Sequence, residues 1–104
     1  MGGFGWMAVR HVVMLKLKQD AAEEDKLRMV RELSSLKDVI PEIKSFHCGL
    51  DAGLAEGNHD FVLTADFASP EDYKAYATHP AHVAVIQEFI KPIVLSRSAV
   101  QFTL

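Results

Sequence analysis

The order of two hydrophobic periodicities along the chain constrains its fold more than any other feature. Four segments alternate apolar and polar residues as β-strands do, and we predict strands at 9–18, 43–49, 59–68 and 94–104. Helical spacing fills the interval between the first two strands and the interval between the last two. The second and third strands are joined by a glycine-containing segment, which predicts a loop.

The first helical region has a predicted start and a predicted end. Asp20 and Glu23 have the spacing of a capping box, in which an acidic side chain accepts early amide protons and the glutamate reaches back. Its apolar positions are Leu27, Val30, Leu33, Leu36 and Ile40. We expect the helix to end near Asp38 or Val39, because the residue before Pro41 is biased away from helical geometry.

The second helical region is divided by a proline. Ser69 is the predicted N-cap of its first part, with Pro70 at the first helical position. Pro80 then opens another helix, with His79 just outside it, and Pro92 ends that helix. The predicted apolar face of this last helix consists of Val83, Ile86, Phe89 and Ile90.

The predicted order is therefore βαββααβ. Two helical regions for four strands place helices on one face of an antiparallel sheet, which indicates an α+β, ferredoxin-like subunit. The strands are nevertheless apolar on both faces. The residues concerned are Val12, Met14, Val62 and Thr64, with one side or the other of Val100, Phe102 and Leu104. A second copy of the chain is the simplest cover for the open face, so we expect a homodimer whose sheets pack face to face.

The composition excludes several classes of protein. A length of 104 residues fits one domain, which we place at 7–104, with residues 1–6 as an extension or a remnant of cloning. The net charge of −3 argues against nucleic acid as a partner, and no apolar run is long enough for a membrane span. The single cysteine, Cys48, favours a reducing, cytoplasmic location, and we expect a small buried side chain there rather than a nucleophile.

Four stretches of the chain carry a resemblance to a known family. They are MAVRHVVMLKLK, LKDVIPEIKSFHCGLD, DFVLTADFASPEDYKAYATHPAHVAVIQEFIKPI and the final VQFTL. Together they resemble the Dabb family, the stress-responsive dimeric α/β-barrel domain, over about residues 7–104, and YATHPAHVAV is the most specific piece. The resemblance implies a dimeric α/β barrel that needs no cofactor.

The resemblance also implies candidate site residues. One plant member of that family is a polyketide cyclase that closes a linear tetraketide into an aromatic acid, using a histidine and a tyrosine in a pocket between sheet and helices. Carried over to this chain, the general base is His82, the tyrosine is Tyr76, the first-strand histidine is His11 and the first histidine of the motif is His79.

The chain departs from that cyclase at two pocket positions. Leu33 stands where the cyclase has a tyrosine on the first helix, and Phe61 stands where it has a histidine on the third strand. Both changes make the expected pocket more apolar and remove groups that would orient an oxygen-rich substrate. We therefore expect Leu33, Phe61 and His79 to contact a small hydrophobic or aromatic molecule.

The chemistry of the histidines leaves two functions open. In a cofactor-independent cyclase or lyase, His82 would remove a proton next to a carbonyl, Tyr76 would donate or orient, and His11 would position the substrate. In a non-catalytic, stress-associated binding or structural protein, the same histidines are scaffold: His79 caps a helix, and His11 and His82 make internal hydrogen bonds. We predict no metal site, because two histidines three residues apart across a proline lack the usual ligand spacing.

Overall fold

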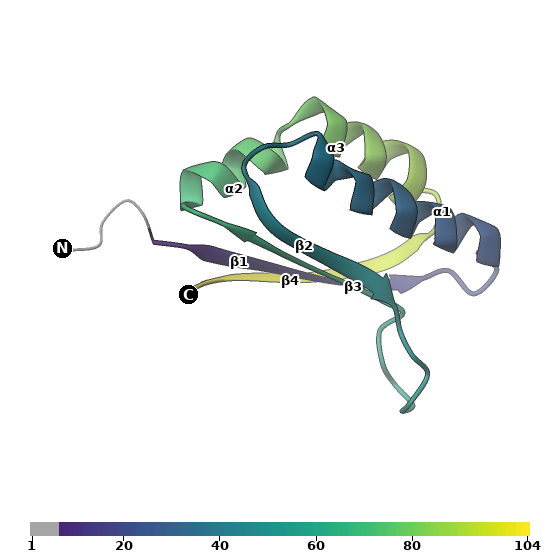
Figure 1. Cartoon of the computed structure of the whole chain (residues 1–104). Helices are drawn as coiled ribbons and strands as arrows, with labels where there is room; N and C mark the ends of the chain where they lie inside the picture. The colour runs from purple at the N-terminus through teal and green to yellow at the C-terminus, as the bar shows by residue number, and fades with distance from the viewer. Residues whose placement is uncertain (1–6) are drawn as a thin grey trace.

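The protein, seen in a computed structural model that describes residues 7–104, is a four-stranded antiparallel sheet with all of its helices on one face (Figure 1). The strands are β1 (Val9–Leu17), β2 (Ile43–Leu50), β3 (Phe61–Phe67) and β4 (Val94–Thr103). Their order across the sheet is β2-β3-β1-β4. The predicted βαββααβ order is confirmed, and the extension expected at residues 1–6 lies outside the described residues.

The helical layer is built from two α-helical regions with irregular ends. Helix α1 (Glu23–Ser34) continues into a 3₁₀ turn, η1 (Ser35–Asp38), so the predicted end near Asp38 is confirmed. Helices α2 (Pro70–Ala77) and α3 (Pro80–Val85) are separated by a break, and α3 continues into a π turn, η2 (Ile86–Ile90). Within residues 7–104, no helix combines the length and hydropathy required to cross a lipid bilayer.

The predicted capping box at the start of α1 is wrong. The N-cap is Ala22, whose side chain makes no capping hydrogen bond. Asp20 instead belongs to a turn in which the Ala21 amide donates to the Lys18 carbonyl at 3.1 Å. The acidic residues of the first helical turn begin at Glu23, where they lie favourably near the positive end of the helix dipole.

Two residues predicted to face the core point outward. Leu27 is 52% exposed and Val83 is 43% exposed, whereas Met29 and Val85, each two positions later, are buried. Residues two apart in an α-helix are separated by about 200° around the axis, so both members of such a pair cannot face the sheet. Each helix packs with the later residue of its pair, Met29 or Val85, toward the core.

The start of α2 is confirmed in detail. Ser69 has extended backbone geometry, its Oγ accepts a hydrogen bond from the Asp72 amide at 3.1 Å, and Pro70 occupies the first turn. We expect Ser69→Ala to lower the free energy of unfolding by about 1 kcal/mol, because an early helix amide loses its acceptor. Chemical denaturation measures the change. Ser69→Asp keeps an acceptor and is the control; equal losses in both variants would contradict this role.

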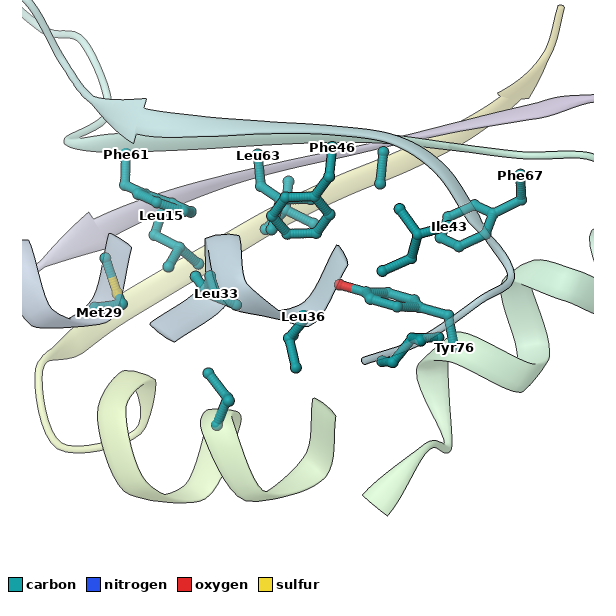
Figure 2. Close-up of a cluster of buried hydrophobic side chains, with 14 of the residues drawn as sticks. Leu15, Met29, Leu33, Leu36, Ile43, Phe46, Phe61, Leu63, Phe67 and Tyr76 are labelled. Carbon is teal, nitrogen blue, oxygen red and sulfur yellow. The ribbon is translucent and has the colours of Figure 1, made fainter. Parts of the chain in front are cut away.

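The core lies between the helix-facing side of the sheet and the helices (Figure 2). Alternate strand residues point into it: Figure 2 shows Leu15, Phe61 and Leu63 on the side of Leu33, and Phe67 beside Ile43 at the Tyr76 end. The ring of Tyr76 enters the same layer from α2, with its hydroxyl directed between the helices and the sheet. Side chains of α2, α3 and the sheet therefore meet around Tyr76.

The opposite face of the sheet carries an apolar stripe, as predicted. Strand pairing places Val12 directly opposite Thr64 on one side and Val100 on the other. The same pairing assigns Val100 and Phe102 of β4 to this face, with exposed fractions of 55% and 47%. We call Val12, Met14, Val62, Val100 and Phe102 the open-face stripe. No helix of residues 7–104 covers it (Figure 1).

Candidate active site

A cavity of about 160 Å³ lies between the sheet and the helices. Its apolar wall consists of Val13, Leu15, Leu33, Phe61, Leu63, Ala77, Ile86 and Ile90. The polar side chains that reach it are His11, Tyr73, Tyr76, His82 and Arg97. A cavity of this size can hold a small aromatic ring. Five of the six predicted site residues line it, and His79 does not.

Among the other depressions on the molecule, two are at least twice as large and are more open to solvent. One, of about 330 Å³, lies beside the β2–β3 connection and includes Met14 and Val62 of the open-face stripe. The other, of about 650 Å³, is lined by surface lysines such as Lys16 and Lys18. Neither joins a histidine to a tyrosine. We place the candidate site in the smaller cavity, because acid–base groups converge only there among these depressions.

A break in the helical layer brings Tyr76 and His82 together. Residues six apart in one continuous α-helix lie about 240° apart around its axis and cannot meet. Here α2 ends at Ala77 and α3 starts at Pro80, so the chain changes direction between them. The two rings lie with their centroids 4.2 Å apart and their planes at 35°. This contact is the centre of the site.

The hydrogen bonding of His82 defines its tautomer. Its Nδ1 lies 3.0 Å from the Ala77 carbonyl oxygen, which can only accept, so Nδ1 carries the proton and Nε2 keeps a lone pair. Burial lowers the pKa of His82, and the charges of Arg97 and His79 lower it further, while the bond to Ala77 opposes them. His82 is consequently neutral at physiological pH and able to accept a proton at Nε2.

His11 is also held neutral, in the other tautomer. Gln101 of β4 donates from Nε2 to Nδ1 of His11 at 2.9 Å, which leaves the His11 proton on Nε2. Burial, followed by the charge of Arg97 and the proximity of His82, lowers the pKa of His11 to about 4. The His11 side chain therefore acts as a hydrogen-bond donor beside the rings of Tyr73 and Tyr76.

The Tyr76 hydroxyl faces the cavity without a hydrogen-bond partner among the residues that the structure describes. The residue is 1% exposed, and burial raises the pKa of its phenol above the ordinary value, with a smaller contribution from Tyr73. Among residues 7–104, this hydroxyl has no hydrogen-bond partner. Every side-chain oxygen or nitrogen that is completely enclosed in this part of the chain does have one, so the Tyr76 hydroxyl is not completely enclosed. The hydroxyl must therefore touch the cavity space, where it stays protonated and can donate.

Three other candidates have clear positions. Leu33 and Phe61 are buried and form apolar cavity wall, as expected from the sequence. His79 caps α3 instead: its Nδ1 accepts a hydrogen bond from the Ala81 amide at 3.1 Å, in agreement with the capping alternative. Cys48 is partly buried, does not line the cavity, and has a pKa raised by burial, which fits a thiol used for packing.

Sequence reasoning missed two polar lining residues. Tyr73 is partly buried, and its ring centroid lies 5.0 Å from that of His11. Arg97 was not singled out, although its alternation with Ala99 and Gln101 places it on the helix-facing side of β4. In the part of the chain that the structure describes, no three histidine, cysteine or acidic side chains gather as metal ligands do.

Comparisons with known proteins agree with this architecture. Residues 9–104 match the family described as Dabb, the stress responsive A/B barrel domain. Olivetolic acid cyclase from Cannabis sativa is 32% identical over 79 residues, which cover 74% of this chain and 78% of the cyclase.

Solved structures show the same fold. A dimeric ferredoxin-like protein of unknown function from Thermobifida fusca is 35% identical, with a TM-score of 0.88 over 98% of this chain and 95% of that one. The hydroxynitrile lyase from Passiflora edulis is 18% identical, with a TM-score of 0.82 over 95% of this chain and 94% of the lyase, which establishes a shared fold alone. On the family match and these relatives, the chain belongs to the Dabb family of stress-responsive A/B barrel domains.

Proposed function

We propose that this Dabb protein binds a small hydrophobic or aromatic molecule in the cavity and converts it, without a cofactor, in a cyclase or lyase reaction. The observation that carries the proposal is the pairing of a neutral His82, whose Nε2 has no hydrogen-bond partner among residues 7–104, with a protonated Tyr76 hydroxyl at one cavity. The relation to olivetolic acid cyclase supports the reaction class. The proposal includes the cytoplasmic location that the single cysteine favours.

The roles follow from the hydrogen-bonding state of each group. Nε2 of His82 removes a proton from the carbon next to a carbonyl, and the imidazolium that forms is stabilised by its Nδ1–H bond to Ala77. The Tyr76 hydroxyl donates a hydrogen bond to the enolate oxygen as negative charge develops. In a ring closure the enolate carbon attacks a second carbonyl, and His82 returns its proton to the resulting alkoxide. His11 orients the substrate through Nε2–H.

A histidine titration by NMR tests the proposal. We expect His82 to titrate below the usual value of about 6.5, because burial lowers its pKa, and to shift when small aromatic or β-keto acids are added. Tyr76→Phe should abolish the ligand-induced shift, because it removes the donor while keeping the ring beside His82. Tyr73→Phe is the matched control, because it removes a hydroxyl from another lining ring.

The alternative is a non-catalytic binding or structural protein. It draws support from the burial of His11 and Tyr76 and from the backbone hydrogen bond of His82, which are also features of well-packed scaffold residues. If the protein is structural, the His82 signals would ignore every ligand in the NMR titration, with or without the Tyr76 hydroxyl. If it binds without catalysis, the signals would shift but the added ligand would remain chemically unchanged. Either result would replace the catalytic proposal.

We also propose that two copies of the chain pair through the open-face stripe. The exposed apolar side chains of Val100 and Phe102 support it, as does the relative from Thermobifida fusca, which is dimeric. Arg10 and Asp66 lie at the edge of the same face and bond to each other at 2.8 and 2.9 Å, so their charges are already compensated. If a second copy placed its own open-face stripe against this one, the two stripes would both be removed from water.

Val100→Glu is expected to convert the dimer into a monomer. The carboxylate would lie within the paired apolar faces, next to Val12, where its desolvation is not compensated. The subunit itself should fold, because Val100 is 55% exposed within it. Light scattering coupled to size exclusion should show the mass of one chain.

The control is Leu54→Glu, which introduces a glutamate at a side chain that is 89% exposed on the β2–β3 connection. This variant should stay dimeric. If the Val100→Glu protein is also dimeric, the proposed interface is refuted.

A further inference from the structure

We propose that Arg97 makes the cavity selective for a ligand that carries a carboxylate next to an apolar body. This inference rests on the proposed function, since it needs the cavity to bind a small molecule, and it goes further by naming the charge that the molecule carries. It depends on the position of Arg97, on its lack of a protein partner and on the shape of the lining.

The position of Arg97 follows from the pairing of β1 with β4. Arg97 lies directly opposite Leu15, a buried cavity residue, and its side chain reaches the lining. Unlike Leu15, Arg97 is exposed, so it stands at the rim, where the cavity meets solvent. A guanidinium at this point can stay hydrated without a ligand and can meet an anion that enters.

Arg97 has no compensating carboxylate among the residues that the structure describes. The ion pairs within residues 7–104 use Arg10, Lys26 and Arg28. No Asp or Glu lines the cavity, and the other ionisable lining groups are histidines and tyrosines. The positive charge of Arg97 also lowers the pKa values of His11 and His82, which shows that its field reaches the candidate acid–base groups. The cavity is therefore apolar in its walls and positive at its rim.

This arrangement gives the ligand a direction. Along β1 the lining runs from His11 through Val13 to Leu15, about 14 Å of strand, with His11 next to Gln101 and Leu15 next to Arg97. A carboxylate held by Arg97 would direct the opposite end of the ligand toward His11, Tyr76 and His82. Guanidinium groups bind carboxylates through two parallel hydrogen bonds, which also fixes orientation. The ligand class is a small aromatic or short-chain carboxylic acid.

Two probes of nearly equal shape test the inference. Benzoate and benzamide differ in charge, and the NMR signals of the lining histidines report the dissociation constant of each. The wild type should bind benzoate at least about tenfold more tightly, because a hydrogen bond to a charged group contributes that much. Arg97→Gln should remove the preference and leave benzamide affinity unchanged. Arg31→Gln, which removes the same charge from the exposed surface of α1, should retain the preference.

The outcomes separate this inference from the proposed function. If both probes bind equally to the wild type, or if Arg97→Gln keeps the preference for benzoate, Arg97 does not select the ligand and the inference is overturned while the binding cavity stands. If neither probe moves any signal of His11 or His82, the cavity does not bind small molecules of this size, and both proposals fail. A preference that disappears only in Arg97→Gln supports the assignment.

Discussion

Phe67→Ala is expected to lower the free energy of unfolding by about 3–5 kcal/mol, the range for deleting a buried aromatic side chain. Phe67 ends β3, is 1% exposed, and lies with its ring centroid 5.1 Å from that of Tyr76 and 5.7 Å from that of Tyr73. Its removal leaves a void beneath both tyrosines that the rigid sheet cannot close. Urea denaturation at a fixed protein concentration measures the loss.

The same substitution links stability to the candidate site. Because Phe67 packs against the ring of Tyr76, its loss should also disturb the NMR signals of His82, which contacts the same ring. Leu54→Ala is the control, since its side chain is 89% exposed and should change stability by less than about 0.5 kcal/mol. A loss below about 1 kcal/mol for Phe67→Ala would mean that the aromatic cluster is not packed as described.

Acidification is expected to cost the fold about 3 kcal/mol through His11 alone. Burial lowers the pKa of folded His11 to about 4 from its usual 6.5. As the pH falls below about 6.5 the unfolded chain takes up a proton at this position, whereas the folded protein does not until about pH 4. The contribution of His11 to stability is therefore complete above pH 6.5, declines between these two values and is constant below the lower one.

Unfolding measured across that pH window in the wild type and in His11→Gln isolates the effect. Glutamine does not titrate and can keep a hydrogen bond with Gln101, so the stability of the wild type relative to the variant should fall as the pH falls through this window. His82, which faces His11, titrates in both proteins and largely cancels in the difference. A gap that is independent of pH would show that the pKa of His11 is the same in the folded and unfolded chains, which would contradict this prediction.

The parts of the fold that depend on local sequence were predicted well. Alternation along β1 is a property of the extended backbone, so the sequence placed His11, Val13 and Leu15 on one face without knowledge of the neighbouring strands. The cap at Ser69 was predicted for a similar reason, because its hydrogen bond is made within one helical turn. At Asp20 the same reasoning failed, since a turn between Lys18 and Ala21 delayed the helix.

Helix orientation and ring contacts were less accessible from the sequence. Leu27 and Val83 fit an apolar helical pattern as well as their buried neighbours do, and only the docking of each helix on the sheet decides between them. The meeting of Tyr76 and His82 depends on the angle between α2 and α3, which the proline break permits but does not specify. Family resemblance named these two residues, and the structure supplied their distance.

Local periodicity, capping chemistry and motif are enough to specify the order of the elements, the faces of the strands, the helix start at Ser69 and the family. The pairing of Leu15 with Arg97, the hydrogen bond from Gln101 to His11 and the contact of Tyr76 with His82 became visible only in the folded chain. These contacts join distant segments through strand register and helix docking. Their geometry results from the packing of the whole core, which no local pattern contains.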